Sequence, residues 1–149
     1  MKYEEFIFHL KRKIKTTKKE IMYVCIGSSK ILWDSVGPRV GTLLKKEMDN
    51  VIGDMEVNFC SKKDYFLNYI KLKGKYIIAI DAAFINEKTK DDIFITNNSI
   101  KMGAGLNKNI GKIGNIGIKA LISNTNDLNE NKIKKISNFI ADGIKSLGN

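Results

Sequence analysis

Two aspartates, Asp34 and Asp81, are the residues of this sequence best placed to do chemistry. Asp34 stands in the loop after the apolar run 21–26, and Asp81 directly follows the apolar run 76–80. Working groups of α/β proteins lie beyond the carboxyl ends of strands, so the two carboxylates face one crevice if these strands are neighbours. Two carboxyl groups in a partly desolvated cleft do not both ionise easily, so one can act as a base toward water and the other as an acid toward a leaving group. This pattern is typical of hydrolytic machinery.

A purely structural interpretation of the two aspartates is also open. An aspartate shortly before a helical proline, as Asp34 is before Pro38, commonly belongs to a loop or a helix cap. An aspartate after a buried strand, such as Asp81, commonly accepts hydrogen bonds from backbone amides and ends the strand. Sequence spacing does not determine the distance between the two carboxyl groups, so both interpretations stand at this point.

Other chemistries have less support in the sequence. His9 is the only histidine and lies in a predicted helix, which would have to reach the crevice for a Ser/His or Cys/His system. Cys25 and Cys60 show no metal-binding or redox spacing, so we expect two small buried side chains in a reducing cytosol. The glycine-rich segment 101–108 matches neither a P-loop nor a dinucleotide fingerprint. Its glycines would permit positive φ angles or the close approach of a backbone, such as that of a substrate. We therefore predict neither a metal nor a cofactor.

Strand and helix patterns alternate along the chain, which predicts a three-layer α/β/α sandwich. Continuous apolar runs predict buried strands, and an alternating run predicts a half-exposed one. The strands expected are 21–26, 55–59, 76–80, 93–95 and 116–122, with the strand at 76–80 stopping at Asp81. The helices expected are 3–19, 38–48, 64–72 and a last one that starts from an Asp127/Glu130 capping box and is closed by Gly148. The strand order cannot be obtained from this pattern.

Length and composition indicate a single domain over residues 1–149, with 43% apolar and 28% charged residues. No apolar run is long enough to span a bilayer and no secretory signal is evident, so we expect a cytoplasmic protein without a membrane partner. The net charge of +10 would favour polyanions. However, the lysine cluster at 11–19 carries no interleaved aromatic residues, and arginine occurs only at Arg12 and Arg39, so we expect a solvated face with weak nucleic-acid affinity.

Four motifs taken together resemble a known family. They are 25–29 (CIGSS), 34–41 (DSVGPRVG), 78–82 (IAIDA) and 103–108 (GAGLNK), the last followed by Gly114. In this order they look like the YyaC-type sporulation proteins, over about residues 21–124. That family is similar in turn to the spore germination protease and, more remotely, to the hydrogenase-maturation endopeptidases.

The resemblance implies a phosphorylase/hydrolase-like fold with a mixed sheet of about five strands, in the cytoplasm, forespore or spore of a Gram-positive bacterium. It also implies an aspartic type of endopeptidase, in which Asp34 and Asp81 match the two aspartates of the germination protease. The hydrogenase-maturation enzymes use a metal-contacting set with a histidine, and no histidine stands in a matching place here, so nickel recognition is not carried over. The residues expected to bind substrate are Ser28, Ser29, Gly37, Pro38, Gly103, Ala104 and Gly105.

Two departures from the family pattern bear on the site. Leu32 and Trp33 precede Asp34 where a small pair is expected, and Met102 stands where proline is usual. Two main hypotheses follow. The first is a sporulation peptidase acting on a peptide or protein, such as small acid-soluble spore proteins. The second is a noncatalytic module that holds a peptide or partner in the same crevice, and a homo-oligomer stays open under both.

Overall fold

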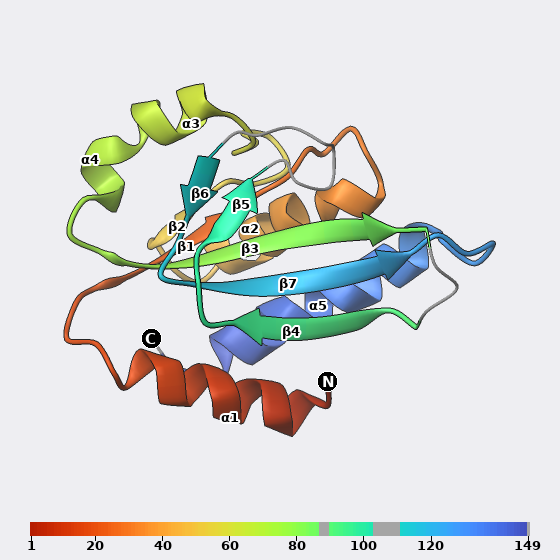
Figure 1. The fold of residues 1–149 in the computed structure, drawn as a ribbon, viewed down its shortest axis with the longest axis horizontal. Coiled ribbons are helices and arrows are strands. Elements are labelled where there is room, and N and C mark those ends of the chain that lie inside the picture. Colours follow the sequence, from red (N-terminus) through yellow and green to blue (C-terminus); the bar gives the residue numbers. More distant parts are fainter. Residues whose placement is uncertain (87–89, 103–110, 149) are drawn as a thin grey trace.

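A mixed five-stranded sheet forms the centre of the computed structural model, which describes residues 1–86, 90–102 and 111–148 (Figure 1). The strands stand in the order β2-β1-β3-β7-β4. Strands β2, β1, β3 and β7 run parallel, and β4 runs antiparallel to β7. The bounds of these strands are β1 Ile21–Cys25, β2 Val51–Ile52, β3 Tyr76–Ile85, β4 Asp92–Thr96 and β7 Ile116–Ser123. The predicted mixed sheet in an α/β arrangement is confirmed.

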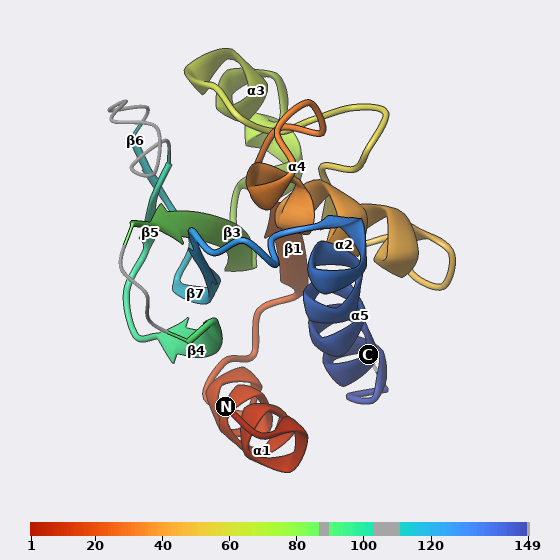
Figure 2. The same ribbon diagram turned by 90° about the vertical axis from the view of Figure 1, so that its right-hand side faces the viewer.

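Different elements cover the two faces of the sheet, as Figure 2 shows edge-on. Helices α1, α2 and α5 cover one face, and α3, α4 and a small hairpin of β5 and β6 cover the other. The bounds are α1 Tyr3–Ile14, α2 Val36–Lys45, α3 Lys62–Leu67, α4 Tyr69–Leu72, α5 Glu130–Lys145, β5 Ile100–Met102 and β6 Gly111–Ile113. The second outer layer is therefore built partly from β-structure.

Side chains of β3 alternate between these two faces, as in any strand. Ile78 and Ile80 are fully buried in the core beneath α1, α2 and α5. Ala79 packs instead with Ile100 and Ile113 of the β5–β6 hairpin. Asp81 follows Ala79 with the period of two, so its carboxyl group lies on the hairpin face of the sheet.

The strand predicted over 55–59 is wrong. The edge strand is the short β2 that precedes it, and in the segment 55–59 only Phe59 makes a bridge, to Ile26. The Asp54 carboxylate explains the difference, because its Oδ1 accepts hydrogen bonds from the backbone N–H groups of Glu56 at 2.8 Å and Val57 at 2.7 Å. Because these N–H groups are bonded within the turn, they cannot donate to a neighbouring strand.

The helices differ from the predicted ones mainly at their ends. Helix α1 stops at Ile14, five residues short of its predicted end, and the Thr16 hydroxyl donates to the Lys13 carbonyl at 2.6 Å just beyond it. Helix α2 begins at Val36 and ends at Lys45, and the predicted helix over 64–72 is two short helices, α3 and α4. None of the helices in the described parts of the chain has both the length and the apolar character needed to cross a bilayer.

The predicted capping box of the last helix is also wrong. The N-cap of α5 is Asn129, whose Oδ1 accepts from the Lys132 backbone N–H at 3.0 Å. Asp127 contacts Thr125 and the Lys132 ammonium instead, and Glu130 forms an ion pair with Arg39 of α2. Glu130 therefore pairs with Arg39, which is distant in the sequence, and does not take part in the predicted capping box.

Candidate active site at the carboxyl end of β1

Asp81 lies inside a strand, and the prediction that the strand stops at this residue is wrong. Strand β3 continues to Ile85 because β7 pairs with it along the whole length from Ile78 to Ile85. Its other neighbour, β1, ends one residue earlier, at the pair Cys25↔Ile80. Asp81 is therefore the first residue of β3 beyond the end of β1, and its backbone is held by the ladder with β7. Its Oδ1 accepts from the Ala82 N–H at 2.8 Å.

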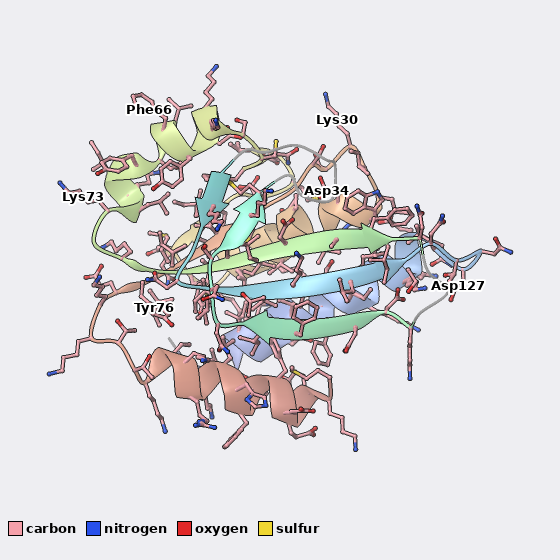
Figure 3. All side chains as sticks on the ribbon, viewed as in Figure 1. Lys30, Asp34, Phe66, Lys73, Tyr76 and Asp127 are labelled. Carbon is pink, nitrogen blue, oxygen red and sulfur yellow. The ribbon has the colours of Figure 1, made fainter. Side chains whose placement is uncertain are left out.

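Asp34 reaches the same end of β1 from the loop that follows this strand. It is the middle residue of the 3-10 helix η1, Trp33–Ser35, which leads directly into α2 (Figure 3). Its Oδ2 accepts a hydrogen bond from the Ser28 N–H at 2.9 Å. Because β1 and β3 are adjacent, the condition on which the paired-carboxylate hypothesis depended is met.

The two carboxyl groups are both buried and they interact. Each residue is only 6% exposed. Burial raises the pKa of Asp34 to about 6, against the smaller opposing effect of its hydrogen bond from Ser28. Burial first, and then the charge of Asp34, raise the pKa of Asp81 to about 8. Near neutral pH, Asp34 is therefore mainly ionised while Asp81 keeps its proton, and the pair titrates as one coupled unit.

Packing on the helix-covered side fixes the position of η1. The ring of Trp33 stacks on Phe84 of β3, with centroids 5.3 Å apart and planes inclined by 19°. The Ser35 hydroxyl donates to the Leu32 carbonyl at 2.6 Å and accepts from Arg39 Nε at 2.9 Å. Trp33 belongs to the edge of this core. It therefore anchors η1 to β3 on the face opposite to Asp81.

Glycines allow α2 and η1 to approach β1 closely. Gly27 has a φ of +144°, and a Cβ on it would lie 2.1 Å from the Asp34 carbonyl oxygen. A Cβ on Gly37 would lie 2.0 Å from the Ile26 carbonyl oxygen. Gly37 and Pro38 are both buried in this packing. The structure thus accounts for them as packing residues, and their predicted role in substrate binding stays a prediction.

The serines predicted to bind substrate lie beside the aspartates. The N–H of Ser28 is used by Asp34, while the Ser29 N–H and hydroxyl donate to Asn58 Oδ1 at 3.0 and 3.2 Å. Both serines are half-buried, so this loop lies beside Asp34 and is partly open to solvent. Gly103, Ala104 and Gly105, the other predicted binding residues, lie outside the described residues.

Lys119 is a charged residue of this region that the sequence analysis did not find. It is the register partner of Asp81 on β7, so both side chains lie on the hairpin face of the sheet. Its charge favours the ionised form of Asp81 and thereby opposes the rise in the pKa of that group. Only the pairing of β3 with β7 reveals this neighbour, because the two residues are far apart in the sequence.

The other polar groups considered from the sequence do not join the site. His9 lies on α1, near Glu5, at the far side of the molecule from η1 (Figures 1 and 2). Burial raises the pKa of the Cys25 thiol, which is fully enclosed. Within residues 1–86, 90–102 and 111–148, no group of three or more His, Cys, Asp or Glu side chains could hold a metal ion.

A solved structure shows the same fold class. The [NiFe] hydrogenase maturation protease HybD from Thermococcus kodakarensis matches 87% of this chain and 99% of its own length, with a TM-score of 0.53 and 17% identity. Hydrogenase 2 maturation peptidase from Thaumarchaeota archaeon SCGC_AB-539-E09 covers 87% of this chain and 99% of its own, with a TM-score of 0.47 and 15% identity. The likeness to HybD shows that the mixed sheet and its helices follow the hydrogenase maturation protease fold.

At the level of sequence, the chain belongs to the family described as Protein of unknown function (DUF1256), whose model matches residues 1–142. YyaC of Bacillus subtilis (strain 168) is 31% identical over 115 residues, which is 73% of this chain. The matched segment spans only 56% of YyaC. The predicted YyaC-type family and the likeness to the hydrogenase maturation proteases are confirmed, whereas a link to the germination protease stays a prediction.

Proposed function

We propose that this protein hydrolyses a peptide bond with Asp34 and Asp81 as a paired general base and general acid. The observation that carries the proposal is the placement of two buried carboxyl groups at the end of β1, where the charge of Asp34 acts on Asp81 and raises its pKa. Pairs of titratable groups whose pKa values are pushed apart by their surroundings are typical of acid/base catalysis. The name of HybD, a protease on the same fold, supports the choice of peptide substrates.

The reaction needs only these two side chains and a water molecule. The Asp34 carboxylate takes a proton from water, and the water oxygen bonds to the carbonyl carbon of the substrate. Asp81 gives its proton to the leaving nitrogen as the C–N bond breaks. The products are a carboxylic acid and an amine, and the proton gained by Asp34 returns to Asp81 through solvent. Each atom and proton is therefore accounted for without a covalent intermediate.

Lys119 supplies positive charge to this reaction. Negative charge develops on the carbonyl oxygen when water adds, and a cation nearby stabilises it most in a site from which water is partly excluded. Lys119 lies across the strand pair from Asp81, on the same face of the sheet. No ion pair of its ammonium is found among the residues that the structure describes, so its charge is available to a substrate oxygen.

The proposal extends to the substrate class and setting. The likeness to YyaC supports a sporulation role in a Gram-positive bacterium. A peptide or protein such as a small acid-soluble spore protein is the substrate that an activity similar to that of the germination protease would take. The buried, protonated Asp81 supports an aspartic type of peptidase. The competing proposal, a noncatalytic binding module, uses the same crevice without turnover.

A peptidase assay with matched variants tests the proposal. Small acid-soluble spore proteins and a random peptide library are incubated with the wild type, Asp34→Asn, Asp81→Asn and Asp49→Asn, and cleavage is followed by mass spectrometry. Asp49 is an exposed carboxylate just before β2, so it lies near the amino ends of the parallel strands, away from Asp34 and Asp81. We expect cleavage by the wild type and Asp49→Asn only. Equal cleavage by Asp34→Asn would contradict the proposal, and peptide binding without any cleavage would favour the binding module.

A further inference from the structure

Five apolar side chains are exposed together on one side of the molecule. They are Val57, Phe66, Leu67, Tyr69 and Ile70, with exposed fractions of 49% to 87%. They belong to α3, α4 and the loop before α3, which lie at the side of the molecule opposite to α1 (Figures 1 and 3). We call this set the α3–α4 surface. A concentration of exposed large apolar side chains on neighbouring elements is typical of a binding surface.

Exposed lysines of the α3–α4 surface outnumber its two acids, Glu56 beside Val57 and Asp64 in the pocket lining. Lys62, Lys63, Lys71 and Lys73 are all exposed, and none of them forms an ion pair with another part of the chain that the structure describes. The carboxylate of Asp64 is occupied within its own helix cap, where Oδ2 accepts from the Cys60 N–H and the Ser61 hydroxyl, both at 2.9 Å. The apolar surface therefore has a positively charged rim.

A pocket opens beside this surface. Its volume is about 220 Å³, and its lining includes Val57, Phe59, Leu67, Asn68 and Lys71. A cavity of about 150 Å³ already holds a benzene ring, so one large apolar side chain fits. Lys71 lies in the wall, where its ammonium can meet an acidic neighbour of that side chain.

We propose that the α3–α4 surface binds an acidic amphipathic segment of a partner protein, with one apolar side chain in the pocket and carboxylates against the lysine rim. This goes beyond the proposed hydrolysis, since none of the residues involved belongs to the aspartate pair. Charge complementarity selects this occupant, because a second copy of a chain with net charge +10 would set lysines against lysines. The concave pocket, which a bilayer surface would leave unfilled, favours a protein segment over an anionic membrane.

Selection of peptides on the intact protein tests the proposal. A phage-displayed library of random 12-residue peptides is selected on the wild type, and the enriched peptides are titrated against Phe66→Ser/Ile70→Ser and Lys63→Glu/Lys71→Glu by fluorescence anisotropy. Phe8→Ser and Lys135→Glu serve as matched controls, since Phe8 on α1 and Lys135 on α5 are exposed residues outside the surface. The same proteins are sedimented with phosphatidylglycerol vesicles and sized by light scattering.

We expect enriched peptides that combine acidic and large apolar residues. Their affinity should fall at least fivefold in both double variants and stay within twofold of the wild type in the controls. The proposal is overturned if no such peptides are enriched, if both double variants bind them as the wild type does, or if the surface instead mediates vesicle binding or self-association. Because binding is measured without turnover, a loss of hydrolysis in the Asp34 and Asp81 variants would leave this result unchanged.

Discussion

The carboxyl end of β1 and the α3–α4 surface depart from ordinary burial in opposite directions. The first places two acidic side chains, each 6% exposed, where apolar groups are usual. The second leaves Phe66 and Ile70 exposed by 80% and 87%. Both arrangements cost stability compared with the reverse placement. The two proposals assign each exception to a contact with something outside the chain, a reacting bond in one case and a partner surface in the other.

The two regions also differ in how firmly they are built. Asp81 is held by the β3–β7 ladder and Asp34 by η1, which is fixed through the Trp33–Phe84 stack. Phe66 and Ile70 project from two short helices that are joined at Asn68. Catalytic groups need fixed geometry, whereas a binding surface can adjust to its partner. Substitutions should therefore have large effects on the first region and small effects on the stability of the second.

The largest expected effect is on hydrolysis. Asp34→Asn and Asp81→Asn each remove one proton-transfer group, and general acid–base catalysis contributes about 10²- to 10⁴-fold, so kcat/KM should fall by about 10³-fold. Wild-type kcat/KM should follow a bell-shaped pH profile with limbs near pH 6 and pH 8, since Asp34 must be ionised and Asp81 protonated. Initial rates of the wild type and the two variants from pH 4 to 10 measure the fall in kcat/KM and the two limbs of the profile. A profile without an alkaline limb would contradict the acid role of Asp81.

The next effect is on stability and is opposite in sign to the effect on activity. The folded state raises the pKa of Asp81 from its ordinary value of 3.8, so the folded state binds more protons and its stability falls as the pH rises from about 4 to about 8. Asp81→Asn removes this loss and should raise the free energy of unfolding by about 2–4 kcal/mol at pH 8, with little change at pH 4. Urea denaturation at both pH values measures the difference. Equal free energies of unfolding of the variant and the wild type at pH 8 would contradict the claim that burial raises the pKa of Asp81.

A smaller change in stability, this time a loss, is expected at the contact between α2 and β1. Gly37→Ala places a Cβ against the Ile26 carbonyl oxygen, which is backbone and cannot move aside easily. We expect a loss of about 1–3 kcal/mol in the free energy of unfolding, typical of overpacking. Gly74→Ala is a useful comparison, because a Cβ there meets nothing within 4 Å although its φ of +76° adds some strain. If Gly37→Ala cost less than Gly74→Ala, the close approach would not matter to stability.

Lys119→Gln is expected to act on the chemistry at the aspartate pair with little effect on the fold. Its positive charge favours ionised Asp81, so its loss should raise the pKa of Asp81 and move the alkaline limb of the pH profile upward. The lost stabilisation of the carbonyl oxygen should lower kcat about 10-fold, with KM changed less. Lys119→Arg should recover part of kcat. An unshifted alkaline limb in Lys119→Gln would show that Lys119 does not influence the pKa of Asp81.

The smallest effect is expected at the α3–α4 surface. Phe66→Ser/Ile70→Ser removes two exposed side chains that contribute little to the core, so the free energy of unfolding should stay within about 0.5 kcal/mol of the wild type. Urea denaturation gives this value on the same protein used for peptide binding. A loss of several kcal/mol would show that these side chains support the fold, and the contrast between the two regions would fail.

The continuous apolar runs 21–26, 76–80 and 116–122 predicted central strands correctly, whereas the alternating run 55–59 predicted a strand that does not form. The sequence placed Asp81 next to a buried strand and Asp34 in the loop after another, but only the β1–β3 pairing brings them together. The end of β3 could not be predicted, because it depends on how far β7 extends beside it. Lys119 was missed for the same reason, since register between distant strands leaves no local pattern.

The segment 64–72 shows a different limit of the sequence. The sequence predicted one short helix over this segment, carrying aromatic and aliphatic residues, and helical structure is indeed present. The chain instead forms two short helices on either side of Asn68, so Leu72 is buried while Phe66 and Ile70 face outward. Apolar periodicity alone does not distinguish a face that packs inside the chain from one left for a partner.

The central claim is that Asp34 and Asp81 share one proton near neutral pH. Carboxyl-carbon NMR titration of the wild type and of Asp34→Asn tests it most directly. We predict that Asp81 titrates near pH 8 in the wild type and at a lower pH in Asp34→Asn, where the neighbouring negative charge is gone. A wild-type Asp81 that titrates near pH 4, or one that titrates at the same pH in both proteins, would contradict the account.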